Sequence, residues 1–209
     1  MHKALTMLLV AGMIWTVGCG APKADTPQQA MKNLKTSIED GDKDLFMATV
    51  VVTPEQKPVV EAMFGVMQEA VALDKALKDK YGKDAGMKGG PSAELKFDGL
   101  DDQANYKVDG DKATFNPKGG DKVDLVKKDG AWQVTIPDAP TGKDAERFMK
   151  VAPAMQKAFA EGRNKVGKEG YTAEKISEEV GQDMMKAMMG GMGDDLKKQM
   201  EDAAKSMKE

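Results

Sequence analysis

The clearest structural signal in the chain is the stretch Val123–Val134, which reads VDLVKKDGAWQV. Apolar and polar residues alternate on both sides of Asp129 and Gly130. A two-residue hairpin turn needs positive φ at both central positions, and Asp followed by Gly tolerates this conformation. The stretch therefore predicts two antiparallel strands with one apolar face and one polar face.

The same alternation continues upstream, around a second Asp-Gly pair at Asp109 and Gly110. Strands are predicted over residues 95–97, 104–108, 113–115, 123–125 and 132–136. Together they form an antiparallel meander of about five strands, which needs helices on one side only. The predicted inward face consists of Leu95, Phe97, Ala104, Tyr106, Val108, Ala113, Phe115, Val123, Leu125, Trp132, Val134 and Ile136.

Three helices are predicted before the sheet. Residues 26–29, TPQQ, form a capping box with Pro at the first helical position, and 53–56, TPEQ, form a second box. The first helix ends at the DGD of residues 40–42, which also caps a short second helix through Phe46. The third is long and ends at Gly82. Its apolar residues recur at spacings of three and four: Val59, Met63, Val66, Ala70, Leu73, Leu77 and Tyr81.

The run DGDKD at residues 40–44 is similar to the start of a calcium-binding loop. Leu45 occupies the position that requires glycine, and Val51 occupies that of the bidentate glutamate. We therefore interpret the run as a helix stop and cap, and expect no metal site there.

The C-terminal third is predicted to be helical, with caps at Thr141 and Thr172 and an amphipathic last helix after the glycine-rich residues 190–193. The fold class is therefore α+β. N-terminal helices pack on the sheet within residues 26–140, and a helical extension occupies residues 141–209.

Close to the N-terminus, Lys3 is followed by an uncharged apolar run at residues 4–17 and then by the only cysteine, Cys19. Residues 16–19, TVGC, resemble the lipobox of bacterial lipoprotein signal peptides, with Thr16 where Leu is commonest in that family. The resemblance implies a signal peptide at 1–18, an acylated Cys19 bearing lipid chains such as palmitate, and a tether at 19–25. In that family an Asp after the lipidated cysteine is the common signal for retention. Since residue 20 is Gly, the resemblance implies that the protein is sorted to the outer membrane if the cell is Gram-negative.

Removal of that leader also removes His2, the only histidine. The mature chain then has no imidazole and no free thiol, which excludes Cys-His and Ser-His nucleophiles, His-liganded zinc and thiol redox chemistry. The net charge of −3 provides no basic field for nucleic acid, so we expect no nucleic-acid partner.

Three helices followed by a meander resemble the nuclear transport factor 2-like, cystatin-like superfamily, and more narrowly its lipoproteins of unknown function. The resemblance rests on TPQQAMKNLKTSIEDGDKDLF at residues 26–46 and on VDLVKKDGAWQV, and it covers roughly residues 26–137. It implies a curved sheet wrapped against the helices around a conical pocket, used by some members for isomerase-like catalysis and by others for binding or dimerisation. Candidate pocket-lining residues are Tyr106, Phe115, Trp132 and Leu73.

The predicted inward face contains no carboxylate, and Asp74 and Glu69 only border the apolar stripe of the third helix. We therefore expect an envelope-anchored, non-enzymatic module without a cofactor, which binds a ligand, a protein partner or a second copy of itself. One alternative is a pocket enzyme of isomerase or hydrolase type, in which Asp74 is the first candidate acid-base group.

The other alternative is a Cu(I)-binding protein, because the sequence MMKAMMGGM contributes Met184, Met185, Met188, Met189 and Met192. Thioether sulfurs are soft ligands that suit Cu(I), and a spacing of four places them on neighbouring helix faces. Ile176, Val180, Met184 and Met188 also continue an apolar stripe, which favours adaptable packing or partner binding.

Overall fold

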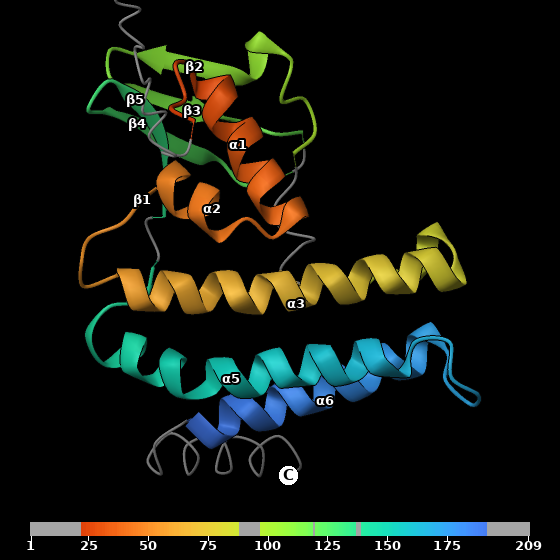
Figure 1. Cartoon of the computed structure of the whole chain (residues 1–209). Coiled ribbons are helices and arrows are strands. Elements are labelled where there is room, and N and C mark those ends of the chain that lie inside the picture. Colours follow the sequence, from red (N-terminus) through yellow and green to blue (C-terminus); the bar gives the residue numbers. More distant parts are fainter. Residues whose placement is uncertain (1–21, 88–96, 119, 137–138, 192–209) are drawn as a thin grey trace, which may run out of the picture.

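The computed structural model describes residues 22–87, 97–118, 120–136 and 139–191. Within them, helices precede a five-stranded sheet and further helices follow it, so the predicted α+β class is confirmed (Figure 1). The elements are α1 (Pro27–Asp40), α2 (Lys43–Thr49), β1 (Val50–Val51), α3 (Lys57–Tyr81), β2 (Tyr106–Asp109), β3 (Lys112–Phe115), β4 (Val123–Lys128), β5 (Ala131–Thr135), α5 (Gly142–Lys165) and α6 (Ala173–Gly191).

The last four strands form the predicted antiparallel meander, in the order β5-β4-β3-β2. The β4–β5 turn is the predicted one, with Asp129 at φ 51° and Gly130 at φ 79°. In the β2–β3 hairpin Asp109 pairs with Lys112, so the central turn residues are Gly110 and Asp111 instead of Asp109 and Gly110. Gly110 at φ 57° still supplies the positive φ that this turn requires.

Among the described residues the fifth strand is not one of those predicted from the alternation. It is β1, which follows α2 directly and lies parallel to β5, with Val50 opposite Val134. Phe97 belongs to no strand, and Leu95 lies outside the described residues. β-Branched residues at 50–52 suit an extended edge strand, and their pairing makes the sheet mixed.

Five residues of the predicted inward face are buried: Ala113, Phe115, Leu125, Trp132 and Val134. Four others are partly buried and pack against the same core: Phe97, Tyr106, Val123 and Ile136. Two residues are exposed instead. Val108 is 55% exposed, and among the described strands β2 is the outermost, with a neighbour on one side only. Ala104 lies in the short 3-10 turn Gln103–Asn105 and is exposed.

The caps of α1 and α2 are as predicted. The Thr26 hydroxyl accepts a hydrogen bond from the Gln29 amide at 3.1 Å. Gly41 ends α1 in the left-handed conformation, at φ 73°. The Asp42 carboxylate then accepts a hydrogen bond from the Leu45 amide at 2.9 Å and starts α2. The DGDKD run therefore serves as a helix stop and cap.

The second capping box forms both of its hydrogen bonds, between Thr53 and Gln56. It closes a turn at residues 54–56, and α3 begins at Lys57. Caps were also predicted for the two helices after the sheet. At the start of α6, the Thr172 hydroxyl accepts a hydrogen bond from the Lys175 amide at 3.2 Å. At the start of α5, the Thr141 hydroxyl makes no capping hydrogen bond.

α3 lies between the first two helices on one side and α5 and α6 on the other (Figure 1), and it contributes side chains to two apolar cores. Val60 and Phe64 pack against the sheet, α1 and α2 in one core. Ala70, Leu73 and Leu77 pack with α5 and α6 in the other. The helices after the sheet therefore share α3 with the sheet domain. No helix among the described residues is long and apolar enough to cross a membrane, and the predicted last helix lies outside them.

Side chains of α3 and α6 both lie close to the backbone of Gly162 in α5. A Cβ atom there would lie 2.5 Å from Val180 Cγ2 of α6 and 3.1 Å from Leu73 Cδ2 of α3. Both neighbours are buried and cannot move aside freely. The absent side chain is therefore what allows this close approach.

We expect Gly162→Ala to lower the free energy of unfolding by about 1–3 kcal/mol, because overpacking outweighs the gain in helix propensity. Gly181→Ala is the matched control, because no neighbouring atom of the described residues lies within 4 Å of its Cβ position in α6. It should raise stability by about 0.5–1 kcal/mol. Urea unfolding of both variants measures the difference, and a Gly162→Ala protein as stable as Gly181→Ala would contradict the packing account.

Candidate binding groove

Two adjoining solvent-open cavities lie at the β4–β5 turn, and both are lined by Lys128, Asp129 and Gln133. The first, of about 280 Å³, lies between the turn, the N-terminal segment and the end of α2. The second, of about 420 Å³, lies between the turn and residues 50–54 along β1. We call the two together the turn groove. Their volumes suit a small group or a short segment of chain.

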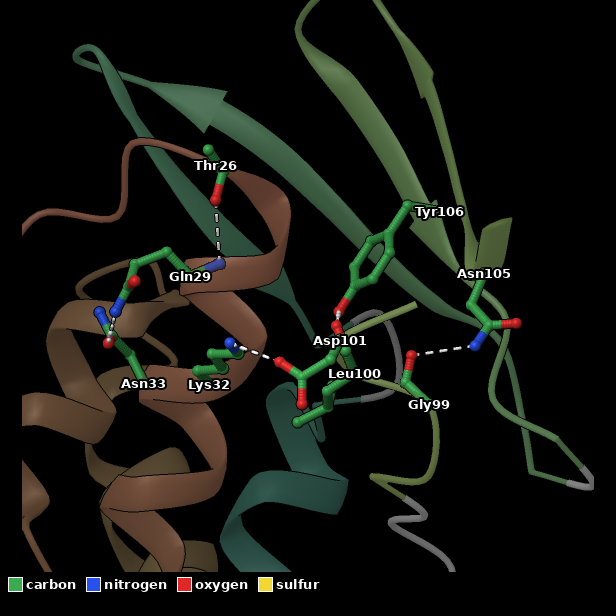
Figure 2. A network of polar contacts seen from close by, with 9 residues as sticks. All are labelled: Thr26, Gln29, Lys32, Asn33, Gly99, Leu100, Asp101, Asn105 and Tyr106. Atoms are coloured by element: carbon green, nitrogen blue, oxygen red, sulfur yellow. Dashed lines mark hydrogen bonds and ion pairs between the residues drawn. The ribbon is translucent and has the colours of Figure 1, made fainter. Parts of the chain in front are cut away.

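The N-terminal segment forms one wall of the groove. The Trp132 amide donates a hydrogen bond to the Ala24 carbonyl at 2.8 Å, and Ala24 is only 4% exposed. Asn33 Nδ2 donates to the Pro22 carbonyl at 3.3 Å, and Asn33 Oδ1 accepts from Gln29 Nε2 at 2.8 Å (Figure 2). The last residues of the predicted tether are therefore fixed to the body, which the short polar sequence around Ala24 does not signal.

The opposite wall joins the sheet to α2. Gln133 Nε2 donates to the Ala48 carbonyl at 3.0 Å, and so satisfies one of the free carbonyls at the end of that helix. The Thr49 hydroxyl donates to the Leu45 carbonyl at 2.7 Å. These polar groups already have partners within the protein, so they serve to hold the groove in shape.

The charged groups of the groove are mostly cationic. Lys23, Lys57 and Lys128 line it, and none of them forms an ion pair with another described residue. Asp129 is the one carboxylate among the lining residues, which include no imidazole and no thiol. Paired acid and base groups are therefore absent from this lining, whereas an anionic group would find several cations.

The groove also opens along the outer edge of the sheet. β1 pairs with β5 on one side, and no strand of the described part of the chain lies on its other side. Met47, Val51 and Val52 provide apolar surface beside this edge. An edge strand presents backbone N–H and C=O groups that an added strand can bind.

The candidate pocket residues fall in different places. Trp132 is 6% exposed and lines the turn groove. Phe115 is fully buried in the core of the sheet and α1. Leu73 belongs to the other core, with α5 and α6. The structure therefore does not bring Leu73 together with the other three.

Tyr106 packs its ring against Phe115, with ring centroids 4.9 Å apart and planes inclined by 34°. Its hydroxyl donates to the Leu100 carbonyl at 3.1 Å (Figure 2). Burial, and to a lesser extent the charge of Asp101, raises the pKa of Tyr106 to about 12. The phenol thus stays protonated and fastens the loop before β2 to the sheet.

The same loop is tied to α1 by Lys32, whose Nζ lies 2.6 Å from Asp101 Oδ1. The hydrogen bond and charge of Lys32 hold the pKa of Asp101 below its usual value. Within the loop, Asn105 Nδ2 donates a hydrogen bond to the Gly99 carbonyl at 2.9 Å (Figure 2). This polar network positions the loop that precedes β2.

The two helix carboxylates considered as acid-base candidates have structural contacts. Asp74 Oδ2 lies 2.6 Å from Lys78 Nζ, and its other oxygen accepts the Met87 amide at 2.9 Å. Glu69 Oε2 lies 3.1 Å from the Arg163 guanidinium and links α3 to α5. Neither lines the turn groove.

The methionine cluster lies on α6, away from the groove. Met184 packs against the core of α3, α5 and α6. Met185, Met188 and Met189 are 61%, 46% and 41% exposed, and Met192 lies outside the described residues. In the part of the chain that the structure describes, no cluster of three His, Cys, Asp or Glu side chains is placed to hold a metal.

Comparison with protein-family models, curated proteins and solved structures finds no match to this chain.

The raised pKa of Tyr106 predicts a pH dependence. The folded state holds this proton more tightly than the unfolded state, whose phenol titrates near 10.0. The contribution to stability is therefore complete below pH 10 and is lost as the pH rises toward 12. Absorbance titration of tyrosinate should show a late step near pH 12 that Tyr106→Phe removes. The control variant Tyr171→Phe should keep that step. If the step disappears in Tyr171→Phe and remains in Tyr106→Phe, its assignment to Tyr106 is wrong.

Proposed function

We propose that this chain is a membrane-tethered, non-enzymatic interaction module that binds an extended, acidic segment of a protein partner in the turn groove. The observation that carries the proposal is the juxtaposition of the unpaired edge of β1 with Lys23, Lys57 and Lys128, which have no ionic partner among the described residues. Strand addition would supply main-chain hydrogen bonds, and the lysines would select acidic side chains.

The apolar part of the groove supports a protein partner. Met47 and the valines at 51 and 52 line the groove beside β1. A flexible methionine next to branched side chains accommodates varied apolar groups. An extended segment that alternates apolar and acidic residues would thus present one kind of side chain to the valines and the other to the lysines.

The proposed lipid anchor would place this groove close to the membrane. Pro22 follows Cys19 by three residues, so their Cα atoms are separated by at most about 11 Å. Pro22 and Ala24 are held by Asn33 and Trp132, and both line the groove. A partner segment close to the membrane surface is therefore the one within reach.

The relationship to the nuclear transport factor 2-like, cystatin-like superfamily is part of the same proposal. Its support is the order of elements: two helices, a long third helix and an antiparallel meander that ends in the Asp129-Gly130 hairpin. Binding members of that superfamily need no catalytic group, in keeping with the lining of the turn groove.

Cys19→Ala tests the anchor. We expect the variant to lose incorporation of a labelled fatty acid and to move from the membrane to the soluble fraction, because acyl chains supply the membrane affinity. Ala21→Ser, which leaves Cys19 in place, should behave as the unaltered chain does. Continued acylation or membrane association of the Cys19→Ala chain would refute the lipoprotein assignment.

Site-specific photo-cross-linking in intact cells tests the groove. A photoreactive phenylalanine in place of Lys128 should give a discrete protein adduct, and added Lys57→Glu should reduce its yield about fivefold, which corresponds to about 1 kcal/mol for one reversed charge. The matched controls place the same probe at the exposed Lys168 and reverse the charge of Lys143. An adduct that is equal at positions 128 and 168, or insensitive to Lys57→Glu, would contradict the proposed groove.

A further inference from the structure

The C-terminal part of α6 changes its relation to the core midway along the helix. Ile176 and Val180 are buried against α3 and α5. Met184, one turn later, is half-buried on the same core. The following methionines, at 185, 188 and 189, are the large apolar side chains of α6 that are most open to solvent. Packing against the described residues accounts for a methionine at position 184. It does not account for methionines at positions 185, 188 and 189.

The four thioethers form a continuous band on the helix surface. With 3.6 residues per turn, Met184, Met188, Met185 and Met189 follow one another, in that order, within an arc of about 140°. The rise from Met184 to Met189 is about 7.5 Å. Side chains three and four residues apart on a helix have Cβ atoms about 5–6 Å apart, so flexible methionine side chains can bring their sulfur atoms together.

The chemistry of the band points to a soft cation. Thioether sulfur is neutral and polarisable, and it binds Cu(I) in preference to hard cations such as Ca²⁺ or Mg²⁺. The described residues contain no thiol and no imidazole, since Cys19 and His2 are the only residues of those types in the chain. Methionine is therefore the soft ligand that this part of the protein has to offer.

The charges beside the band are compatible with a bound cation. Lys186, which projects from the same stretch of α6, has its Nζ 3.0 Å from Asp183 Oδ1. Gln182 Nε2 donates to Glu178 Oε1 at 3.3 Å on the preceding turn. The nearby ammonium group is thus paired with a carboxylate, which reduces its repulsion of a metal ion.

We propose that Met184, Met185, Met188 and Met189 form a site for one Cu(I) ion on the surface of α6, with Met184 anchored to the core and the other three closing over the metal. Binding consists of donation of sulfur lone pairs to the cation, without electron transfer. The site is separate from the turn groove and does not depend on the interaction proposed there.

The experiment uses the full chain in detergent with Cys19→Ala, so that no thiol competes. Anaerobic titration with Cu(I) against a chromophoric Cu(I) chelator gives stoichiometry and affinity. We expect each chain to bind one Cu(I) ion tightly. The affinity for Cu(I) should fall at least tenfold when Met185, Met188 and Met189 are all changed to Leu. The matched control is Met63→Leu with Met67→Leu, a half-buried pair on α3 with the same spacing, which should retain the affinity.

Leucine keeps the apolar surface and removes the sulfur, so the substitution separates metal binding from docking of an apolar partner. A second readout is NMR of ¹³C-methyl methionine with Ag(I), a redox-stable soft cation. The methyl signals of Met184, Met185, Met188 and Met189 should shift together at one equivalent. Absence of binding by the unaltered chain, unchanged affinity in the triple-leucine variant, or equal shifts at all methionines would overturn the proposal.

Discussion

Helix α3 is buried on two sides, and the rest of the structure depends on that constraint. A helix with one apolar stripe needs one covering layer, whereas two apolar faces need a layer on each side. Val60 and Phe64 are covered by the sheet and the first two helices, and Leu73 and Leu77 by α5 and α6. The helices after the sheet are thus required to complete the burial of a helix that precedes it.

This arrangement leaves the end of the sheet at the β4–β5 turn free for binding. The core-facing side chains are occupied in packing, and Tyr106 and Asp101 fasten the loop before β2. The N-terminal segment and the end of α2 meet the turn through Ala24, Ala48 and their hydrogen bonds. The cationic side chains of Lys23, Lys57 and Lys128 remain around the resulting groove, and the proposed recognition of an anionic segment rests on their charge.

The two proposed sites use different chemistry because they lie on differently constrained surfaces. The groove is held in shape by hydrogen bonds from the Asn33 and Gln133 side chains to backbone carbonyls and by the backbone bond from Trp132 to Ala24. The methionine band lies on one helix and consists of flexible side chains, which can adjust around a metal ion. A strand edge and lysines suit a polypeptide, and adjustable thioethers suit a soft cation.

The sequence by itself determined the features whose physics is local. The positive φ of Asp129 and Gly130, the caps at Thr26 and Asp42, and the left-handed Gly41 each depend on a few adjacent residues, and all were predictable. The tertiary structure alone decided that Val50 pairs with Val134, that Ala24 is buried and that Val108 and Met185 are exposed. Those outcomes depend on which distant surface covers each residue, and short-range spacing contains no information on that.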